Sequence, residues 1–143
     1  MAYNPVWKNK IEIGTTYATS AWTYSELAEG IESMNPNFTE NNSVFHFLAD
    51  EGWAHNEVTG AEPSIQIAGR RVVGDAAQDY IVGKAFALGP DRNSSVKITA
   101  EGKIITCDCT ITDIIGFGGN GIDVNQFGCT IRFNGKPVVT DAA

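Results

Sequence analysis

The clearest hydrophobic pattern in the chain lies between residues 74 and 90, where apolar residues recur at spacings of three and four. This period places them on one stripe of an α-helix. Asp75 stands in the N-cap position, and Gln78 follows three residues later, where a capping-box partner belongs. Gly89 and Pro90 end the pattern, because glycine adopts the left-handed cap and proline cannot continue a helix. The sequence therefore predicts a helix over about residues 75–88, with an apolar stripe of Ala77, Tyr80, Ile81, Ala85 and Leu88.

Most of the remaining pattern alternates between apolar and polar residues, as in half-buried β-strands. The longest example is residues 103–115, which place Ile105, Cys107, Cys109 and Ile111 on one face. Further strands are predicted at residues 10–17, 62–73, 95–100, 122–134 and 138–140. Turn signals separate them about every ten residues, at Glu101-Gly102, at the glycine-rich run 116–121 and at Asn134-Gly135. The sequence thus predicts a mainly β fold with one α-helix, an antiparallel β-sandwich or barrel flanked by the helix.

Residues 22–36 are compatible with two structures. Leu27, Ile31 and Met34 have helical spacing and Ser25 can cap a helix, so local propensity favours a short helix. In a strand, Leu27 and Ile31 would share one face instead. The local pattern alone favours the helix.

Residues 38–61 show no period and are rich in Asn, Glu and Gly, which predicts a long loop. The loop is too apolar for a disordered linker, since it contains Phe45, Phe47, Leu48 and Trp53. Either these side chains fold back onto their own domain, or another chain buries them. The first ten residues form a predicted N-terminal arm, in which Trp7 either anchors the arm to a surface or belongs to a frayed end.

The length of 143 residues predicts a single domain, residues 1–143. The start of the chain lacks the apolar segment of a signal peptide, and no apolar run approaches the roughly 20 residues of a membrane helix. Three cysteines argue against a disulfide framework. Ten basic and seventeen acidic residues give a net charge of −7, which disfavours tight binding of nucleic-acid phosphates.

Residues suited to catalysis or to binding a cofactor are sparse. His46 and His55 flank two acidic residues, but their spacing matches no common zinc or calcium pattern. Cys107 and Cys109 point to one face of a strand, which is more typical of core packing than of metal ligation. The glycine-rich run 116–121 joins two strands and does not open a helix, so it lacks the features of a phosphate-binding loop. We therefore expect neither an enzyme nor a bound cofactor or metal.

In order along the chain, several stretches resemble the major tail tube protein of long-tailed bacteriophages, as found in phages of Gram-positive hosts. They are WTYSELAEGIESMNPNFTE at residues 22–40, IQIAGRRVVGDAAQDYIVGKAFALG at 65–89 and IRFNGKPVV at 131–139. No single motif is diagnostic, and the resemblance rests on their order and spacing over most of the chain. It implies a β-sandwich or barrel flanked by one helix, and it implies that residues 22–36 form a strand of the sheet that lines the tube.

The resemblance also implies a function. Six subunits would form a ring, and stacked rings would form a hollow tube in the virion tail, assembled in the host cytoplasm together with other tail proteins. The long loop, with Phe45, Phe47, Leu48 and Trp53, and the arm with Trp7 would join subunits and rings. DNA would pass through the lumen without specific binding, and Glu29, Glu32 and Glu62 are candidates to face it. No membrane partner is expected.

Two alternatives remain open at the sequence level. One is the tube protein of a contractile injection or secretion system. The other is a monomeric β-sandwich that binds carbohydrate, with Tyr17, Trp22 and Trp53 as an aromatic platform.

Overall fold

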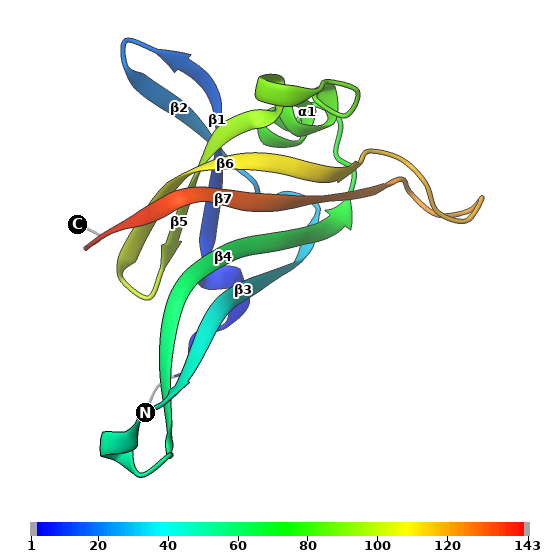
Figure 1. Cartoon of the computed structure of the whole chain (residues 1–143). Helices are drawn as coiled ribbons and strands as arrows, with labels where there is room; N and C mark the ends of the chain where they lie inside the picture. The colour runs from blue at the N-terminus through cyan, green and yellow to red at the C-terminus, as the bar shows by residue number, and fades with distance from the viewer. Residues whose placement is uncertain (1–2, 142–143) are drawn as a thin grey trace.

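The computed structural model describes residues 3–141, and the two residues at each end of the chain, including the first two of the predicted arm, lie outside this range. Within it, seven strands form one sheet in the order β2-β1-β5-β6-β7-β4-β3 (Figure 1). Every pair of neighbouring strands is antiparallel. The strands are β1 (Lys10–Ala18), β2 (Ala21–Glu26), β3 (Ile31–His46), β4 (Ala54–Arg70), β5 (Asn93–Ala100), β6 (Lys103–Ile115) and β7 (Gln126–Asp141). The predicted mainly β, antiparallel fold with one flanking helix is confirmed.

The sheet encloses the core on one of its faces. Only residues 27–30 connect its two edge strands, β2 and β3, so the sheet must curl to bring these edges together. The inward side chains come from strands far apart in the sheet order and meet in one apolar cluster. Its members on the strands and the β2–β3 connection are Ile11, Ile13, Leu27, Ile65, Ile67, Val96, Ile98, Cys107, Cys109, Ile111, Phe127, Cys129 and Ile131.

The helix α1 (Ala76–Gly83) contributes buried Ala77 and Ile81 to this core. It ends five residues before the predicted position, because short turns follow it, with the Lys84 and Ala85 amides donating to Ile81 and Val82 carbonyls. Ala85 and Leu88 therefore do not extend the buried stripe, and Leu88 is 83% exposed. No helix within residues 3–141 is long and apolar enough to cross a membrane.

The short helix favoured by local propensity for residues 22–36 is wrong. These residues form β2 and the start of β3, as the resemblance implied. The Leu27 amide donates to the Ile11 carbonyl at 2.9 Å, and Leu27 lies in the core. Gly30 turns the chain with φ +79°, where a Cβ would lie 2.5 Å from the Arg70 carbonyl oxygen. Pairing with β1 and β4 thus outweighs the weak helical preference of the segment.

The predicted loop at residues 38–61 is instead the outer part of a β3–β4 hairpin. Strand pairing continues from Phe38 opposite Pro63 to His46 opposite Ala54, with one irregularity between Asn41 and Asn42. Only residues 47–53 form the connection. The sequence of residues 38–61 does not show the alternation of apolar and polar residues that is typical of a half-buried strand, because both faces of this ribbon mix the two kinds of residue.

The strand predicted at residues 103–115 coincides with β6, and its inward cysteines are buried. The predicted turn at Asn134-Gly135 is wrong, since β7 continues through it to Asp141. The pairs Thr106 with Val138 and Asp108 with Asn134 show a bulge there, and Gly135 has φ +84°. Glycine accommodates the extra residues without ending the strand.

Candidate assembly surfaces

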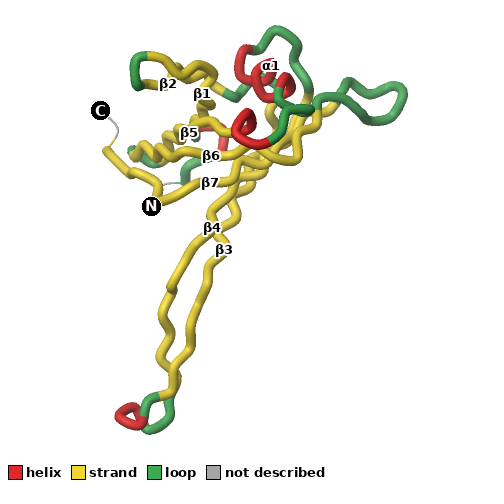
Figure 2. Tube along the Cα trace, turned by 45° about the horizontal axis from the view of Figure 1, so that its top comes forward, coloured by secondary structure: helices red, strands yellow, loops and turns green. Residues whose placement is uncertain are grey.

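The outer β3–β4 hairpin, residues 38–61, projects from the body of the protein as a two-stranded arm (Figure 2). The register places Phe38, Val44 and Val58 on the face that continues the core side of the sheet. These side chains are 66%, 51% and 60% exposed, because no other element covers the arm. This face of the arm, although it also carries polar residues, therefore exposes three apolar side chains that its own chain does not bury.

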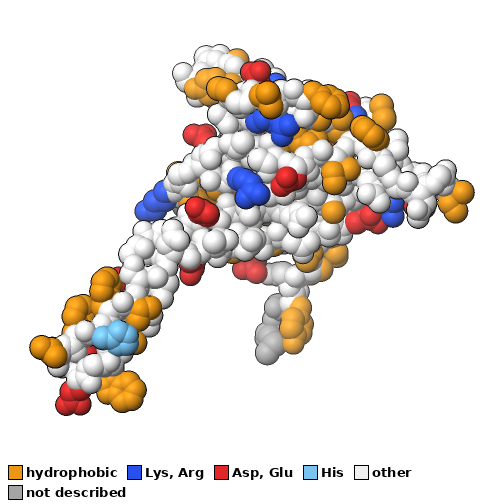
Figure 3. Space-filling model, turned by 45° about the vertical axis from the view of Figure 1, so that its right-hand side comes forward, with side chains coloured by type: hydrophobic (Ala, Val, Ile, Leu, Met, Phe, Trp, Pro, Cys, Tyr) orange, Lys and Arg blue, Asp and Glu red, His pale blue; other side chains and the backbone are white. Residues whose placement is uncertain are grey.

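The hairpin tip, residues 45–53, has a defined structure. The Phe45 and Phe47 rings stack with centroids 5.8 Å apart, and the Phe47 ring lies 6.0 Å from the ring of His55. A 3₁₀ turn, η2 (Leu48–Asp50), is closed by the Gly52 amide, which donates to the Phe47 carbonyl at 3.1 Å. Leu48 is fully exposed and Trp53 is 76% exposed. Hydrophobic side chains accordingly gather at the end of the arm in Figure 3.

Both histidines of this region are engaged locally. His46 donates through Nδ1 to the Gly52 carbonyl oxygen at 2.9 Å, and His55 Nε2 lies 2.9 Å from Glu57 Oε1. Across residues 3–141, no three His, Cys, Asp or Glu side chains cluster in a way that would hold a metal ion.

Trp7 lies in a 3₁₀ turn, η1 (Val6–Lys8), and is 80% exposed. A cavity of about 330 Å³ separates this turn from the start of β3 and is lined by Trp7, Leu27 and Met34 among others. Its own subunit therefore leaves Trp7 largely exposed, and the role of Trp7 in the N-terminal arm stays a prediction.

The outward face of the sheet is polar and makes its own hydrogen bonds. Arg132 donates from Nε to Thr112 Oγ1 at 3.1 Å, and Asn134 donates from Nδ2 to Thr110 Oγ1 at 2.8 Å. Other side chains on this face are Glu12, Ser64, Gln66, Lys97, Thr106, Asp108 and Thr130. An open groove of about 410 Å³ lies on this face and is lined by Gln66 and Thr130 among others, so the face is both polar and locally hollowed.

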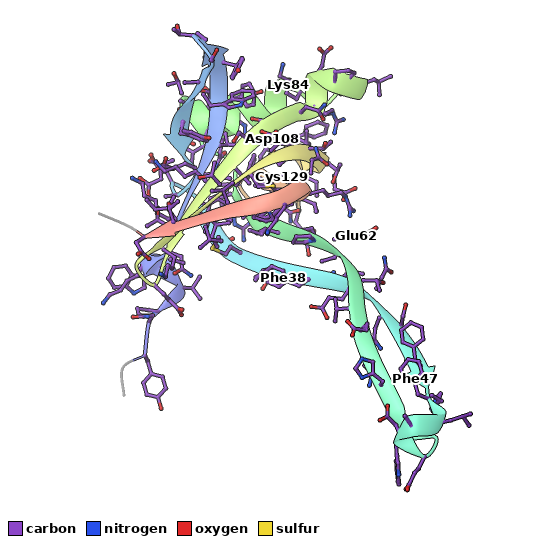
Figure 4. The ribbon with its side chains drawn as sticks, turned by 60° about the vertical axis from the view of Figure 1, so that its left-hand side comes forward. Phe38, Phe47, Glu62, Lys84, Asp108 and Cys129 are labelled. Carbon is purple, nitrogen blue, oxygen red and sulfur yellow. The ribbon has the colours of Figure 1, made fainter. Side chains whose placement is uncertain are left out.

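The three acidic candidates do not lie together on this face. Glu62 is exposed on β4, in register with Ser64 and Gln66 (Figure 4). Glu32 pairs with Arg70 at 3.3 Å beside the bulge of β3, and both line an open groove of about 410 Å³. Glu29 is exposed in the β2–β3 connection. Strand register places Glu62 on the polar face, and the ion pair with Arg70 places Glu32 beside the groove on the same face.

The helix α1 is capped at its N-terminus and is joined by hydrogen bonds to backbone outside it. Asp75 is the N-cap of α1, and its carboxylate accepts from the Gln78 amide at 3.1 Å. The Gln78 side chain does not complete the capping box, because it is fully buried and bonded elsewhere. Its Nε2 donates to the Glu29 and Arg70 carbonyls at 2.9 and 3.0 Å, and its Oε1 accepts from the Val72 amide at 2.7 Å. Gln78 thus ties the helix to the β2–β3 connection and to the end of β4, a role that its position in the sequence does not reveal.

Sequence reasoning missed a group of exposed apolar residues on either side of α1 and in the β6–β7 connection. Phe86 and Leu88 are 94% and 83% exposed after the helix, and Val73 is 84% exposed before it. Phe117 and Ile122, in the connection from β6 to β7, are 74% and 98% exposed. The predicted helix includes Phe86 and Leu88 and places Leu88 in its apolar stripe, whereas the observed helix ends at Gly83 and leaves both side chains exposed.

The three cysteines are free and buried in the core. Burial raises the pKa of both Cys109 and Cys129 to about 12, and it also raises the pKa of Cys107. A thiol held in its neutral form is a poor nucleophile and a poor metal ligand. These residues serve as small apolar core side chains.

No protein-family model and no curated protein sequence matches the chain. Solved structures do resemble it. One is a chain in the tail of an empty gene transfer agent (GTA) particle with C6 symmetry, with 17% identity and a TM-score of 0.72 over 97% of this chain and 99% of that chain. Another belongs to the virion of a native GTA particle, with 15% identity and a TM-score of 0.73 over 96% and 99% of the two chains. At these identities the likeness concerns the fold: the chain folds as a chain of a GTA particle tail does, over nearly its whole length.

Proposed function

We propose that this chain is a structural subunit of a hollow tail tube in a phage or phage-like particle. Six copies would form a ring, and rings would stack into the tube. The fold likeness to a chain of a six-fold symmetric GTA tail supports this proposal. The source in a phage of a Gram-positive host rests on the sequence resemblance alone.

The observation that carries the proposal is the projecting hairpin. Phe38, Leu48 and Trp53 are exposed on an element that cannot bury them within its own chain. Apolar surface of this kind, held on an ordered arm, is typical of an interface. Full burial of each large side chain would contribute roughly 1.5–3 kcal/mol. Burial of these side chains by another chain is therefore favoured over their folding back onto their own domain.

The polar outward face of the sheet suits the inside of such a tube. Its hydroxyl and amide groups bond to one another, and the chain's acidic excess would repel DNA phosphates. DNA would then pass without specific binding. Glu62 is the strongest of the acidic candidates for this lining, and Glu29 and Glu32 remain candidates from the ends of the edge strands.

The remaining expectations follow from this role. The protein would act without catalysis, its partners would be copies of itself and other tail proteins, and its place would be the virion tail after assembly in the host cytoplasm. The tube protein of a contractile injection or secretion system remains an alternative. The genes next to this one would distinguish that system from a long-tailed phage.

A carbohydrate-binding module is disfavoured by the arrangement of its three proposed aromatic residues. Tyr17 and Trp22 pair with centroids 5.2 Å apart near the turn of the β1–β2 hairpin. Trp53 lies on the β3–β4 hairpin tip, at the opposite end of the molecule (Figure 1). The three side chains therefore form no common platform.

The direct test is negative-stain microscopy of the purified protein with sedimentation over a range of salt and protein concentrations. Six-fold rings or hollow tubes are expected. A protein that stays monomeric under all conditions, including after addition of preformed tail initiator complexes, would contradict the proposal.

A further inference from the structure

The turn that follows α1, residues 84–88, is held rigidly while its apolar side chains point to solvent. Arg92 donates from Nη2 to the Ala85 carbonyl at 2.7 Å and from Nε to the Ala87 carbonyl at 2.9 Å. Its Nη1 donates to the Ile111 carbonyl of β6 at 3.1 Å, which fixes the turn to the sheet. Phe86, between the two bonded carbonyls, is 94% exposed. We call residues 84–88 the acceptor turn.

The acceptor turn and the hairpin tip have the same design. Each displays large apolar side chains on a backbone closed by hydrogen bonds, so little conformational entropy is lost when they bind. They lie at opposite ends of the molecule, as the positions of Lys84 and Phe47 show in Figure 4. Hydrophobic side chains gather both at the tip and along the opposite side of the protein in Figure 3.

The charges of the two surfaces are complementary. Residues 33–69, which include the outer hairpin 38–61, contain no Lys or Arg, and their acidic residues are Glu40, Asp50, Glu51, Glu57 and Glu62. Lys84, on the acceptor turn, has its ammonium 5.3 Å from the centroid of the Tyr80 ring. It forms no salt bridge with any residue from 3 to 141. Its charge is free to meet a carboxylate of another chain.

From these observations we propose that the hairpin tip of one copy docks on the acceptor turn of a second copy. Leu48 and Trp53 would pack against Phe86 and Leu88, with Asp50 near Lys84. The inference rests on the proposed function and names the two surfaces that join successive rings. Two different surfaces at opposite ends form a heterologous contact, which repeats without closing and so extends a stack.

Cysteine crosslinking tests the pairing. Leu48→Cys and Phe86→Cys would be introduced together and the assembled protein oxidised under mild conditions. A disulfide requires Cα atoms within roughly 7 Å, so it forms only at a direct contact. A ladder of covalent oligomers on a non-reducing gel, removed by reductant, is expected. The buried native thiols leave little background.

Two further variants keep the test decisive. Ala49→Cys with Ala87→Cys retains the apolar side chains, in case the first pair weakens docking. Leu48→Cys with Val138→Cys, an exposed position on β7, is the matched control and should give no ladder. Tubes seen by microscopy without a crosslink from either test pair, or with one from the control, would overturn the inference and leave the proposed function standing. Absence of any rings or tubes from the unaltered protein would overturn both.

A charge exchange tests the same contact without crosslinking. Asp50→Lys places two positive groups together and should abolish or strongly reduce tubes. Adding Lys84→Glu should restore them, whereas adding Lys136→Glu on β7 should not. Restoration by both second changes, or by neither, would contradict the specific pairing.

Discussion

Gln78 shows how one buried polar side chain can fix a whole architecture. Its amide group bonds to the backbone next to β3 and to the backbone at the end of β4, from a helix that packs on the core. A buried amide is tolerated because its donors and acceptors are satisfied. A residue outside the sheet therefore bonds both to the β2–β3 connection and to the end of the neighbouring strand β4.

We expect Gln78→Ala to lower the free energy of unfolding by about 2–4 kcal/mol, because buried groups left without partners cost roughly 1–3 kcal/mol each. Chemical denaturation of the monomer would measure this. Gln66→Ala, at an exposed position on β4, is the matched control and should change stability by no more than about 0.5 kcal/mol. Equal effects of the two substitutions would show that the Gln78 hydrogen bonds do not stabilise the fold.

The cysteines give a second prediction at this scale. Since the pKa of Cys109 and of Cys129 is about 12, both thiols should resist a thiol reagent at pH 8 in the native protein and react fully in denaturant. Because the pKa values of these thiols are raised in the folded state, the unfolded state loses the thiol protons at a lower pH than the folded state does. Stability should therefore be unaffected below about pH 9 and fall as the pH rises from there toward 12. Rapid labelling of the native protein at pH 8 would contradict the burial.

At the scale of elements, the hairpin separates folding from assembly. Its outer strands satisfy each other's backbone groups, so the arm holds its shape without a core beneath it. The apolar side chains of residues 38–61 add nothing to the core cluster of the subunit. Changes in the arm should consequently alter association and leave folding intact.

Changing Phe45, Phe47 and Trp53 together to Ser should abolish rings and tubes while the monomer unfolds at nearly the original denaturant concentration. Microscopy and denaturation on the same preparation would measure both effects. Ile67→Ser, at a buried position of β4, is the contrasting control and should impair folding itself. Loss of folding in the triple variant would place these side chains in the subunit core.

A shortened hairpin tests the same division more strongly. Replacing residues 38–63 by Asn-Gly joins Asn37 to Ser64, which already face each other in the ladder, through a two-residue turn. A folded monomer that no longer assembles is expected by circular dichroism and sedimentation. Tubes formed by this variant would show that the hairpin is dispensable.

At the scale of the whole molecule, the curled sheet gives the protein two unlike surfaces. The inner face carries the core, and the outer face is polar and open. In a closed ring the outer faces of neighbouring copies would meet around a channel. Strand edges would be covered there by neighbours rather than left open to uncontrolled pairing.

Glu62→Cys tests which surface faces the channel. In assembled tubes this thiol should react with a small maleimide and resist one carrying a long polymer, because the lumen admits only the small reagent. The same variant as free subunits should react with both. Equal reaction of tubes with the two reagents would place Glu62 on the outside of the tube.

Some of this protein is determined by local sequence. The start of α1 follows from the capping chemistry of Asp75, and β6 follows from strict alternation along a half-buried strand. These features depend on neighbours within a few residues, where periodicity and capping carry the information.

Other features were decided only by tertiary structure. The helical preference of residues 22–36 yielded to pairing with β1 and β4, and residues 38–61 form a ribbon because each strand pairs with the other. The bracing role of Gln78 depends on hydrogen bonds to the Glu29 and Arg70 carbonyls. The exposed position of Phe86 depends on Arg92, which bonds to the backbone of the turn that contains it. Each of these outcomes depends on contacts between residues distant in the chain. A local pattern cannot encode them, because the competing energies arise only when those segments meet.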